Sequence, residues 1–379
     1  MYDVVIVGGG PVGSSAAKIC SKAGLKTLVL EEHSSIGYPV QCAGLLSNSA
    51  FTECEVSSDS VYNTVSGAKI IGSSNSIEFD SGVTKAYVVD RGRLDFEIAE
   101  MAAESGAEYK LKTSVSKINP EKKLIHTHTE DIPYNLLIAA DGPRSVCARS
   151  IGSTRSEFIY SGIQAEIPCD VNKSLVELYP NASPDFFAWM IPLSEKRARI
   201  GLCGTKNVPA LFSQFKSRFT DSNVHSVTGT VPIGVRKKTF GDGVMLCGDA
   251  AGFPKPTSGG GIYTGIRSAR HASAVAVSVC ESGNYSDEAL SVYENLWRND
   301  FGRELDTGLK ALKLRRGFTE ADIDSVLGAL NNPDIIETII NYGDMDKPST
   351  ILKKLITRPE VMAKLSAVGI RGLFRKVMG

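Results

Sequence analysis

We predict the fold of this chain from the stretch YDVVIVGGGPVG at residues 2–13. Its first half is an unbroken apolar, β-branched run, which is typical of a strand that is buried on both faces of a parallel sheet. Residues 14–23 are small and compatible with a helix, and residues 25–30 form a second apolar run that ends in Glu31. The order of strand, glycine turn, helix and strand predicts a βαβ unit with a G-x-G-x-x-G sequence at its first turn.

The glycine turn indicates a dinucleotide-binding site, because each of its glycines has a separate role in such a turn. Gly8 permits the tight turn, Gly10 lets the backbone approach a pyrophosphate, and Gly13 lets the helix pack closely on the strand. The anion then binds the unpaired N–H groups at the helix N-terminus. Glu31 stands about twenty positions after the turn, where its carboxylate would accept hydrogen bonds from the adenosine ribose.

Composition narrows the class of protein. The length of 379 residues predicts two or three domains. Lysine plus arginine and aspartate plus glutamate number 42 each, so no overall charge favours nucleic acid as a partner. The five histidines show no metal-ligand spacing, and the eight scattered cysteines predict free thiols in a reducing compartment. No apolar run approaches the roughly eighteen residues of a membrane span, and the first residues lack a basic segment, so we expect a cytoplasmic protein.

The rest of the chain divides by pattern. Apolar runs at residues 134–140 and 244–247 match the parallel-sheet style of the first strand, whereas residues 51–86 and about 155–235 predict short strands and an antiparallel sheet. The α/β class therefore combines a Rossmann-like domain, an inserted antiparallel β-sheet domain and a C-terminal helical region. We place the dinucleotide-binding domain at residues 1–50, 86–152 and 236–285, the inserted substrate domain at 51–85 and 153–235, and the helical region at 286–379.

Two more strand ends carry sequences that a nicotinamide dehydrogenase does not require. IAADGPRS at residues 138–145 continues to Arg149, and GDAAG at residues 248–252 is followed by Pro256 and by GGGI at residues 259–262. With the first turn, they resemble the three fingerprints of the glutathione-reductase-type FAD fold, in its p-hydroxybenzoate hydroxylase branch. Within that branch the sequence resembles the geranylgeranyl reductase family, flavoproteins that saturate isoprenoid chains. The resemblance implies FAD as the cofactor.

The third of these sequences predicts contacts to the flavin. Asp249 follows a predicted strand, where its carboxylate can accept a hydrogen bond from a ribityl hydroxyl. Gly259 to Gly261 leave backbone N–H groups bare at the positive end of a helix dipole, and Gly261 and Ile262 are the expected contacts. That end suits the pyrimidine edge of reduced flavin, which carries negative charge.

The resemblance implies two further FAD contacts. Arg91, in the sequence DRGRLD, matches a family arginine that reaches FAD, and Val115 falls where the family backbone passes the adenine. The alternative for Arg91 is a solvated arginine at a helix start, a role for which Arg93 is the better candidate. For Asp141 with Arg149, an FAD contact and stabilisation of a turn are both open.

The expected reaction points to a cysteine. Reduction of an isolated trisubstituted alkene needs a hydride at one carbon and a proton at the other; reduced flavin supplies the hydride, so the protein must provide the proton in a dry pocket. Cys42 resembles the cysteine that follows P-V-x in these reductases, close to the flavin ring. An ordinary thiol, with a pKa of about 8.5, is protonated at neutral pH and can donate. The alternative is a buried cysteine that acts as a small apolar residue.

The residues after this cysteine depart from the family pattern. The family often has C-G-x-G-L-S, whereas residues 42–47 are CAGLLS. The resemblance implies that the backbones of Ala43 and Leu45 contact FAD, and the shifted glycine bears directly on these two contacts.

The inserted domain carries the candidate substrate site. FFAWMIP at residues 186–192 resembles the Y-x-W-x-F-P motif of the reductases, so Phe187, Trp189 and Pro192 are its expected substrate-binding residues. Aromatic walls suit a long prenyl chain because its burial is apolar and non-directional. Plain core packing is the alternative, and the stretch also partly matches the W-x-W-x-I-P motif of flavin halogenases.

The C-terminal segment is basic and contains apolar positions at roughly helical spacing. Such a segment can rest on an anionic membrane surface, or it can be a solvated basic face that docks on the protein. Its basic residues are Lys347, Lys353, Lys354, Arg358, Lys364, Arg371, Arg375 and Lys376, and its apolar positions are Val361, Leu365, Val368, Ile370, Leu373 and Phe374.

We therefore predict an FAD-dependent reductase that saturates geranylgeranyl C=C bonds of a prenyl lipid, with NAD(P)H or ferredoxin as the electron donor. One alternative is a flavin monooxygenase or halogenase of the same branch, which uncoupled oxygen consumption with an aromatic substrate would favour. Another is a prenyl-lipid-binding protein without redox chemistry, like the Rab GDP-dissociation inhibitors. The complete GDAAG and GGGI sequences argue against that second alternative.

Overall fold

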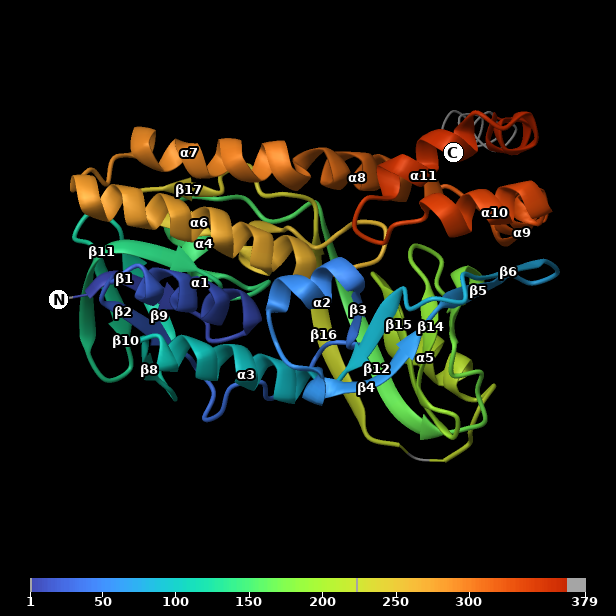
Figure 1. Cartoon of the computed structure of the whole chain (residues 1–379), viewed down its shortest axis with the longest axis horizontal. Helices are drawn as coiled ribbons and strands as arrows, with labels where there is room; N and C mark the ends of the chain where they lie inside the picture. The colour runs from blue at the N-terminus through green and yellow to red at the C-terminus, as the bar shows by residue number, and fades with distance from the viewer. Residues whose placement is uncertain (1, 223, 367–379) are drawn as a thin grey trace.

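The chain forms an elongated molecule with a sheet at each end, as the computed structural model shows for residues 2–222 and 224–366 (Figure 1). The larger sheet lies at the N-terminal end and the second sheet at the opposite end. Helices from the C-terminal region extend along one side of both (Figure 1). The α/β class predicted from the sequence is confirmed.

The larger sheet has eight strands in the order β17-β18-β11-β1-β2-β8, with β9 and β10 added beside β11. Its pairs β18–β11, β11–β1, β1–β2 and β2–β8 are parallel. The apolar runs that predicted these strands are buried, because a parallel sheet is covered on both faces. The strands are β1 (Tyr2–Val7), β2 (Thr27–Leu30), β8 (Glu108–Lys110), β9 (Val115–Asn119), β10 (Leu124–Thr127), β11 (Asp131–Ala139), β17 (Phe240–Gly241) and β18 (Val244–Leu246).

Three helices lie side by side along this sheet, with α1 (Pro11–Lys22) between α3 (Arg91–Glu104) and α6 (Ile262–Ser282) (Figure 1). Small residues allow the close approach of α1 and α6: Ser273 Oγ donates a hydrogen bond to the Ala16 carbonyl at 3.3 Å. The short helix α4 (Val146–Ser150) contacts β9 and β18.

The second sheet has seven strands in the order β16-β12-β15-β14-β13-β5-β6. All pairs are antiparallel except β13–β5, which is parallel. The helix α5 packs Phe212 and Phe215 on one face of this sheet. The elements are β5 (Gly67–Ile71), β6 (Ser76–Asp80), β12 (Phe158–Pro168), β13 (Leu175–Tyr179), η2 (Pro180–Ala182), β14 (Ala188–Ser194), β15 (Arg197–Gly204), α5 (Val208–Lys216) and β16 (Ser226–Ile233).

A small three-stranded sheet, in the order β3-β7-β4, joins the two larger ones. We predicted only strands from residue 51 onward, but residues 51–54 belong to a helix, α2. That helix begins after Ser47, whose Oγ caps it by accepting a hydrogen bond from Ala50 N at 3.0 Å. The elements are β3 (Leu45–Ser47), α2 (Asn48–Cys54), η1 (Ser58–Ser60), β4 (Val61–Val65) and β7 (Ala86–Val89).

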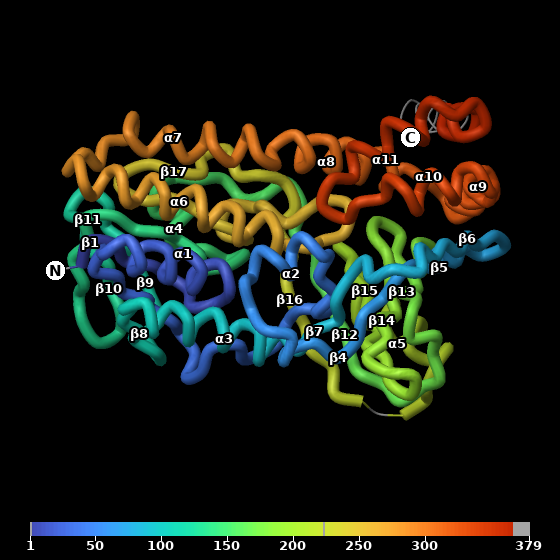
Figure 2. The backbone as a smooth tube through the Cα atoms, in the orientation of Figure 1, coloured from blue at the N-terminus to red at the C-terminus, as the bar shows by residue number. Residues whose placement is uncertain are grey.

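The C-terminal region is helical (Figure 2). Pro333 and Pro348 are the first residues of α10 and α11, where the fixed φ of proline suits a helix start. Its elements are α7 (Asp287–Trp297), the π-helix η4 (Arg298–Gly302), α8 (Arg303–Arg315), α9 (Glu320–Leu330), α10 (Pro333–Tyr342) and α11 (Pro348–Ile356). The predicted basic and apolar positions Val368, Ile370, Arg371, Leu373, Phe374, Arg375 and Lys376 lie outside the described residues.

Residues 2–222 and 224–366 contain no candidate membrane span and no candidate metal site. None of the described helices combines the length and the apolar character that a membrane span requires. Nowhere in the same residues do three His, Cys, Asp or Glu side chains come together in a way that could hold a metal ion.

Candidate active site

Three strand ends meet at one edge of the larger sheet, and each carries one of the predicted fingerprints. A Cβ built on Gly8 would lie 2.3 Å from the Ala140 carbonyl oxygen, so the first turn lies against the end of β11. Cys247 N donates a hydrogen bond to the Ala139 carbonyl at 2.8 Å, which fixes the end of β18 beside the same point. Because β1, β11 and β18 are parallel, sequence segments more than a hundred residues apart share this edge.

Within the first turn, Gly13 is crowded like Gly8, whereas Gly10 faces open space. A Cβ on Gly13 would lie 1.9 Å from the Gly8 carbonyl oxygen, so only glycine permits this contact between helix and strand. A Cβ on Gly10 would meet no atom within 4 Å. Gly10 is the N-cap of α1 and has a φ of −67°, so no packing contact or backbone strain requires glycine there. The open space beside the helix N-terminus fits a pyrophosphate.

The end of β2 places Glu31 beside the first turn. Its Oε2 accepts a hydrogen bond from Gly9 N at 2.7 Å, and its Oε1 accepts one from His33 N at 2.9 Å. Thr113 N donates to the Glu31 carbonyl at 2.8 Å, which brings the segment that leads to the buried Val115 alongside. The side chain and the backbone predicted to hold the adenosine therefore lie at the same strand end; their contacts with FAD stay predictions.

Asp249 lies in η3 (Gly248–Ala251), directly after β18, and faces the start of α6. A Cβ on Gly261 would lie 2.9 Å from Asp249 Oδ1, so glycine is needed for this approach. Burial raises the pKa of Asp249 to about 6, and the nearby charge of Arg91 opposes that rise. The first turn of α6, which begins at Ile262, contains no acidic residue of its own. Two of the N–H groups predicted to be bare are hydrogen-bonded, because Gly259 N donates to the Lys255 carbonyl at 2.8 Å and Gly260 N donates to Ser258 Oγ at 3.3 Å.

Arg91 is buried at the start of α3, whereas Arg93 is exposed and pairs with Asp59. The Arg91 guanidinium makes a bidentate ion pair with Asp95, with N–O distances of 2.8–3.0 Å. Although burial alone would lower it, this carboxylate raises the pKa of Arg91. The side chain is therefore held as a buried cation near Asp249, as an FAD contact would need.

Two side chains of the second sheet hold the segment that contains Cys42. Gln164 Nε2 donates to the Cys42 carbonyl at 3.0 Å, and Arg199 donates to the Ala43 carbonyl at 2.6 Å. The thiol itself is partly buried, and its Sγ accepts a long hydrogen bond from Gly44 N at 3.4 Å. Gln164 Oε1 is buried without a partner among the described residues. The predicted flavin-contacting segment is thus fixed to the predicted substrate domain.

The aromatic motif of β14 lies partly on this segment. Phe187 and Trp189 are in edge-to-face contact, with ring centroids 6.2 Å apart. Trp189 packs in the same apolar cluster as Ala43 and Leu45, and its Nε1 is buried without a partner among the described residues. By strand alternation, Pro192 points to the opposite face, with the residues that pack on α5. The structure therefore brings Phe187 and Trp189 toward the flavin-contacting segment, and the position of Pro192 does not favour a substrate contact.

The second fingerprint stabilises a turn. Asp141 Oδ2 accepts a hydrogen bond from Cys147 N at 3.1 Å in the first turn of α4, and Arg149 donates to the Arg144 carbonyl at 2.7 Å. These contacts fit the turn-stabilising role; Asp141 Oδ1 is buried without a partner among the described residues, so the FAD contact stays a prediction as well.

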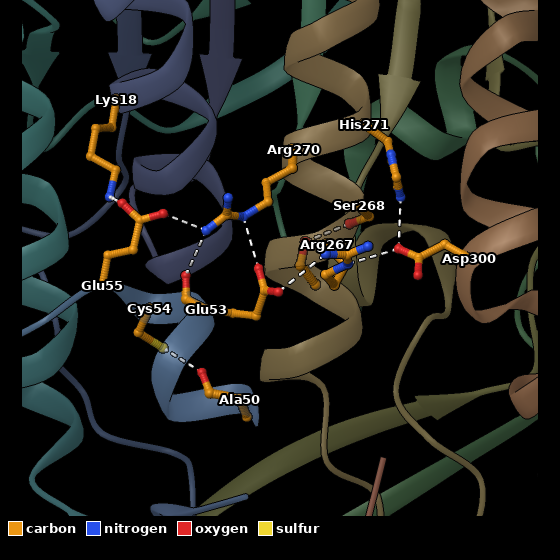
Figure 3. A network of polar contacts seen from close by, with 11 residues as sticks. Lys18, Ala50, Glu53, Cys54, Glu55, Arg267, Ser268, Arg270, His271 and Asp300 are labelled. Atoms are coloured by element: carbon orange, nitrogen blue, oxygen red, sulfur yellow. Dashed lines mark hydrogen bonds and ion pairs between the residues drawn. The ribbon is translucent and has the colours of Figure 1, made fainter. Parts of the chain in front are cut away.

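A network of charges holds α2 to α6 (Figure 3). Arg267 on α6 pairs with Glu53 on α2 at 3.1 Å and with Asp300 on η4 at 2.7 Å. Burial alone would raise the pKa of Asp300, but the hydrogen bonds from His271 and Arg267 lower it to about 2. The network fixes α6, whose first turn faces Asp249, to α2, which follows the Cys42 segment. Its members are Lys18, Glu53, Glu55, Arg267, Arg270, His271 and Asp300.

Sequence reasoning missed four residues that hold segments of this site: Gln164 and Arg199, and the ion pair between Lys255 and Asp346. The strand positions of Gln164 and Arg199 carry no motif, and only the pairing of β12 with β15 brings them together. Lys255 could have been identified from the sequence, because it stands between two prolines in the loop that precedes GGGI. Asp346 comes from the C-terminal region, ninety-one positions after Lys255, and nothing local marks it.

Comparison with known proteins gives four findings. The model of the FAD binding domain family matches residues 1–303. Digeranylgeranylglycerophospholipid reductase 2 of Methanothermobacter thermautotrophicus is 30% identical over 88% of this chain and 93% of its own length. A crystal structure of a geranylgeranyl bacteriochlorophyll reductase-like protein from Thermoplasma acidophilum matches 97% of this chain and 99% of that chain, with a TM-score of 0.86 and 28% identity. The flavin-dependent brominase Bmp2 shares the fold at 20% identity and a TM-score of 0.70, over 93% of this chain and 98% of that chain.

Proposed function

This chain belongs to the geranylgeranyl reductase family of FAD-binding proteins, and on that premise we propose that it saturates C=C bonds of the isoprenoid chains of a prenyl lipid. It is an FAD-dependent oxidoreductase. The named activity of the M. thermautotrophicus relative makes a digeranylgeranylglycerophospholipid the first substrate to test.

One observation carries the proposal: the segment that contains Cys42, Ala43 and Leu45 packs with Trp189 of β14, and Cys42 lies close enough to the buried Arg91 to influence its charge. Trp189 packs in one cluster with Ala43 and Leu45, so an apolar chain that rests on the Trp189 face lies beside the predicted flavin contacts. Apolar burial of this kind suits a prenyl chain, which offers no hydrogen-bonding group to the protein.

We assign the steps of binding to this chain's own residues. The open space at Gly10 and the N-terminus of α1 would hold the pyrophosphate, Glu31 the ribose, and Asp249 a ribityl hydroxyl. When bound and reduced, FAD supplies the hydride. The N-terminus of α6, at Gly261 and Ile262, would orient the pyrimidine edge.

We propose Cys42 as the proton donor to the second alkene carbon. Gln164 and Arg199 hold the carbonyls of Cys42 and Ala43, so the backbone that carries the thiol is fixed on the side of the substrate domain. A fixed donor lowers the barrier because the geometry of proton transfer is set before the reaction. For the donor of electrons we propose NAD(P)H or ferredoxin.

We further propose the domain division of residues 1–50, 86–152 and 236–285 for FAD, 51–85 and 153–235 for substrate, and 286–379 as a helical region. The last region, on a cytoplasmic protein, would touch the membrane that holds the lipid. Four exposed large apolar side chains support this: Tyr342, Met345, Ile356 and Met362. Part of the basic face docks on the protein instead, since Lys354 lies 3.7 Å from the centroid of the Tyr342 ring. Co-sedimentation with anionic vesicles, but not with zwitterionic ones, is the expected result.

The deciding experiment mixes the dithionite-reduced protein anaerobically with a geranylgeranyl lipid, and in parallel with its fully saturated phytanyl counterpart. We expect flavin reoxidation only with the unsaturated lipid, together with a product mass gain of two hydrogens for each bond reduced. No reoxidation with any prenyl lipid would refute the proposal. A flavin that stays reduced without oxygen but consumes oxygen when an aromatic substrate is added would instead favour the monooxygenase or halogenase alternative.

A further inference from the structure

A buried ion pair joins the C-terminal region to the loop that precedes α6. Lys255 Nζ pairs with Asp346 Oδ1, and the two residues are only 6% and 3% exposed. Lys255 Nζ also donates to the Met345 carbonyl at 3.0 Å. The second carboxylate oxygen, Asp346 Oδ2, accepts a hydrogen bond from Ser47 Oγ. Both charges are therefore largely removed from solvent, and each has two partners.

The lysine stem lies against the glycine turn that faces Asp249. Lys255 N donates to the Gly260 carbonyl at 3.0 Å, and the Lys255 carbonyl accepts a hydrogen bond from Gly259 N at 2.8 Å. A Cβ on Gly260 would lie 3.3 Å from Lys255 Cε and 3.7 Å from Nζ. The ammonium group is therefore next to the glycine turn of residues 259–261, which ends at Gly261, the N-cap of α6.

The carboxylate of the pair reaches a second part of the site. Ser47 is the N-cap of α2 and follows the segment of Cys42, Ala43 and Leu45. Three segments that are distant in sequence therefore end on one pair of charges: the loop before α6, the start of α2 and the turn between α10 and α11.

A structural role alone does not account for this arrangement. A buried ion pair contributes little net stability, because the loss of hydration of both charges offsets their attraction. An apolar pair of similar size would hold the three segments equally well. What an apolar pair would not provide is a positive charge beside the glycine turn, in a low-dielectric environment where a charge acts over several ångströms.

We propose that Lys255 and Asp346 together set the reduction potential of the bound flavin. This rests on the proposed function, which places the pyrimidine edge at Gly261 and Ile262, directly after the glycines that contact Lys255. Reduction of the flavin by two electrons and one proton leaves one negative charge on that edge, which the ammonium group of Lys255 stabilises. Asp346 holds the ammonium group in place and partly cancels its charge. The reduction potential therefore lies between the value expected with an uncompensated Lys255 and the value expected without the lysine charge.

The test is the two-electron midpoint potential of the bound flavin, measured anaerobically by slow enzymatic reduction with a reference dye. Asp346→Asn leaves Lys255 uncompensated, so the ratio of affinities for reduced over oxidised FAD should rise at least tenfold, a positive shift of about 30 mV. Lys255→Met should lower that ratio by at least the same factor. The double variant Lys255→Met/Asp346→Asn removes both charges and should lie between the single variants.

Two further variants keep the test decisive. Ser47→Ala removes a hydrogen bond to Asp346 but no charge. Its ratio of affinities for reduced over oxidised FAD should therefore stay within threefold of the wild-type ratio. Lys255→Gln keeps a donor for Asp346 and has the same expected sign as Lys255→Met, so it replaces that variant if the methionine protein does not fold.

The outcomes separate this inference from the proposed function. Asp346→Asn and Lys255→Met change the charge in opposite directions. If both potentials equal the wild-type value, or if both shift in the same direction, the inference is overturned. If the wild-type protein is yellow and reduces geranylgeranyl lipids while these potentials do not move, only the inference fails. If the wild-type protein binds no FAD, the proposed function and the inference fail together.

Discussion

Two glycines of the first turn, Gly10 and Gly13, allow folding and cofactor binding to be tested apart. Each is changed to alanine, which adds the same methyl group three positions apart in one turn. In Gly13→Ala the new Cβ would lie 1.9 Å from the Gly8 carbonyl oxygen, whereas ordinary contact begins at 3.4 Å. In Gly10→Ala the new Cβ meets no protein atom within 4 Å.

The expected stability changes follow from these distances. At Gly13, the new Cβ clashes with a backbone carbonyl, which has no rotamer to change, so helix α1 must withdraw. Overpacking of this kind costs about 3 kcal/mol. For domains of about 150–250 residues that corresponds to a fall in Tm of roughly 6–12 °C. At Gly10, alanine restricts the unfolded chain, a gain of about 0.4–1 kcal/mol, but it is a poorer N-cap than glycine by a similar amount. The apoprotein of Gly10→Ala should therefore unfold within about 1 kcal/mol of wild type.

Cofactor affinity should change in the opposite order. The alanine methyl at position 10 occupies the open space beside the N-terminus of α1, so a pyrophosphate there is displaced from the N–H groups. Loss of two hydrogen bonds to a charged group, at about 1.5–3 kcal/mol each, weakens FAD binding by about 100-fold or more. The measurements are the Tm of the flavin-free proteins by circular dichroism and the Kd for FAD by quenching of flavin fluorescence. Wild-type FAD affinity in Gly10→Ala would refute the placement of the pyrophosphate, and a wild-type Tm in Gly13→Ala would refute the close contact of α1 and β1.

Three other predictions concern the reaction and the charge network. Cys42→Ala should retain bound flavin but slow its reoxidation by prenyl lipid at least tenfold in stopped-flow absorbance. The control Cys280→Ala removes a thiol near the end of α6 and should leave the reoxidation rate unchanged. Equal rates for both variants would exclude Cys42 as the proton donor. Trp189→Phe should raise KM for a geranylgeranyl lipid several-fold with little change in kcat, because it shortens an apolar wall, and a KM that stays constant in steady-state assays would mean that the indole only fills the core. The lowered pKa of Asp300, about 2, stabilises the fold by about 1–2 kcal/mol above its unfolded pKa near 3.8, and that stability is lost as the pH falls through 2. Asp300→Asn should therefore be less stable than wild type in urea at pH 7, with a difference that shrinks between pH 4 and pH 2; a difference independent of pH would contradict this assignment.

The sequence by itself determined the parts of this protein that depend on neighbouring residues. The strand β1, the glycine turn, α1, β2 and Glu31 lie within about thirty residues, and their hydrophobic pattern and glycine spacing fix a βαβ unit wherever the rest of the chain goes. The second and third fingerprints could be recognised for the same reason, and so could the helical C-terminal region. The helix α2 was missed because seven residues give too short a pattern; its signal was the cap at Ser47.

Only the tertiary structure decided which residues meet at the site. Ser47 and Asp346 are 299 positions apart, and Gln164 reaches Cys42 across 122 positions. Strand alternation separates Pro192 from Trp189, although both belong to one motif. Such contacts follow from sheet order, strand register and the docking of the C-terminal helices, which are set by the packing of the whole core. A local pattern specifies an element and its buried face, but not the distant partner that this face will meet.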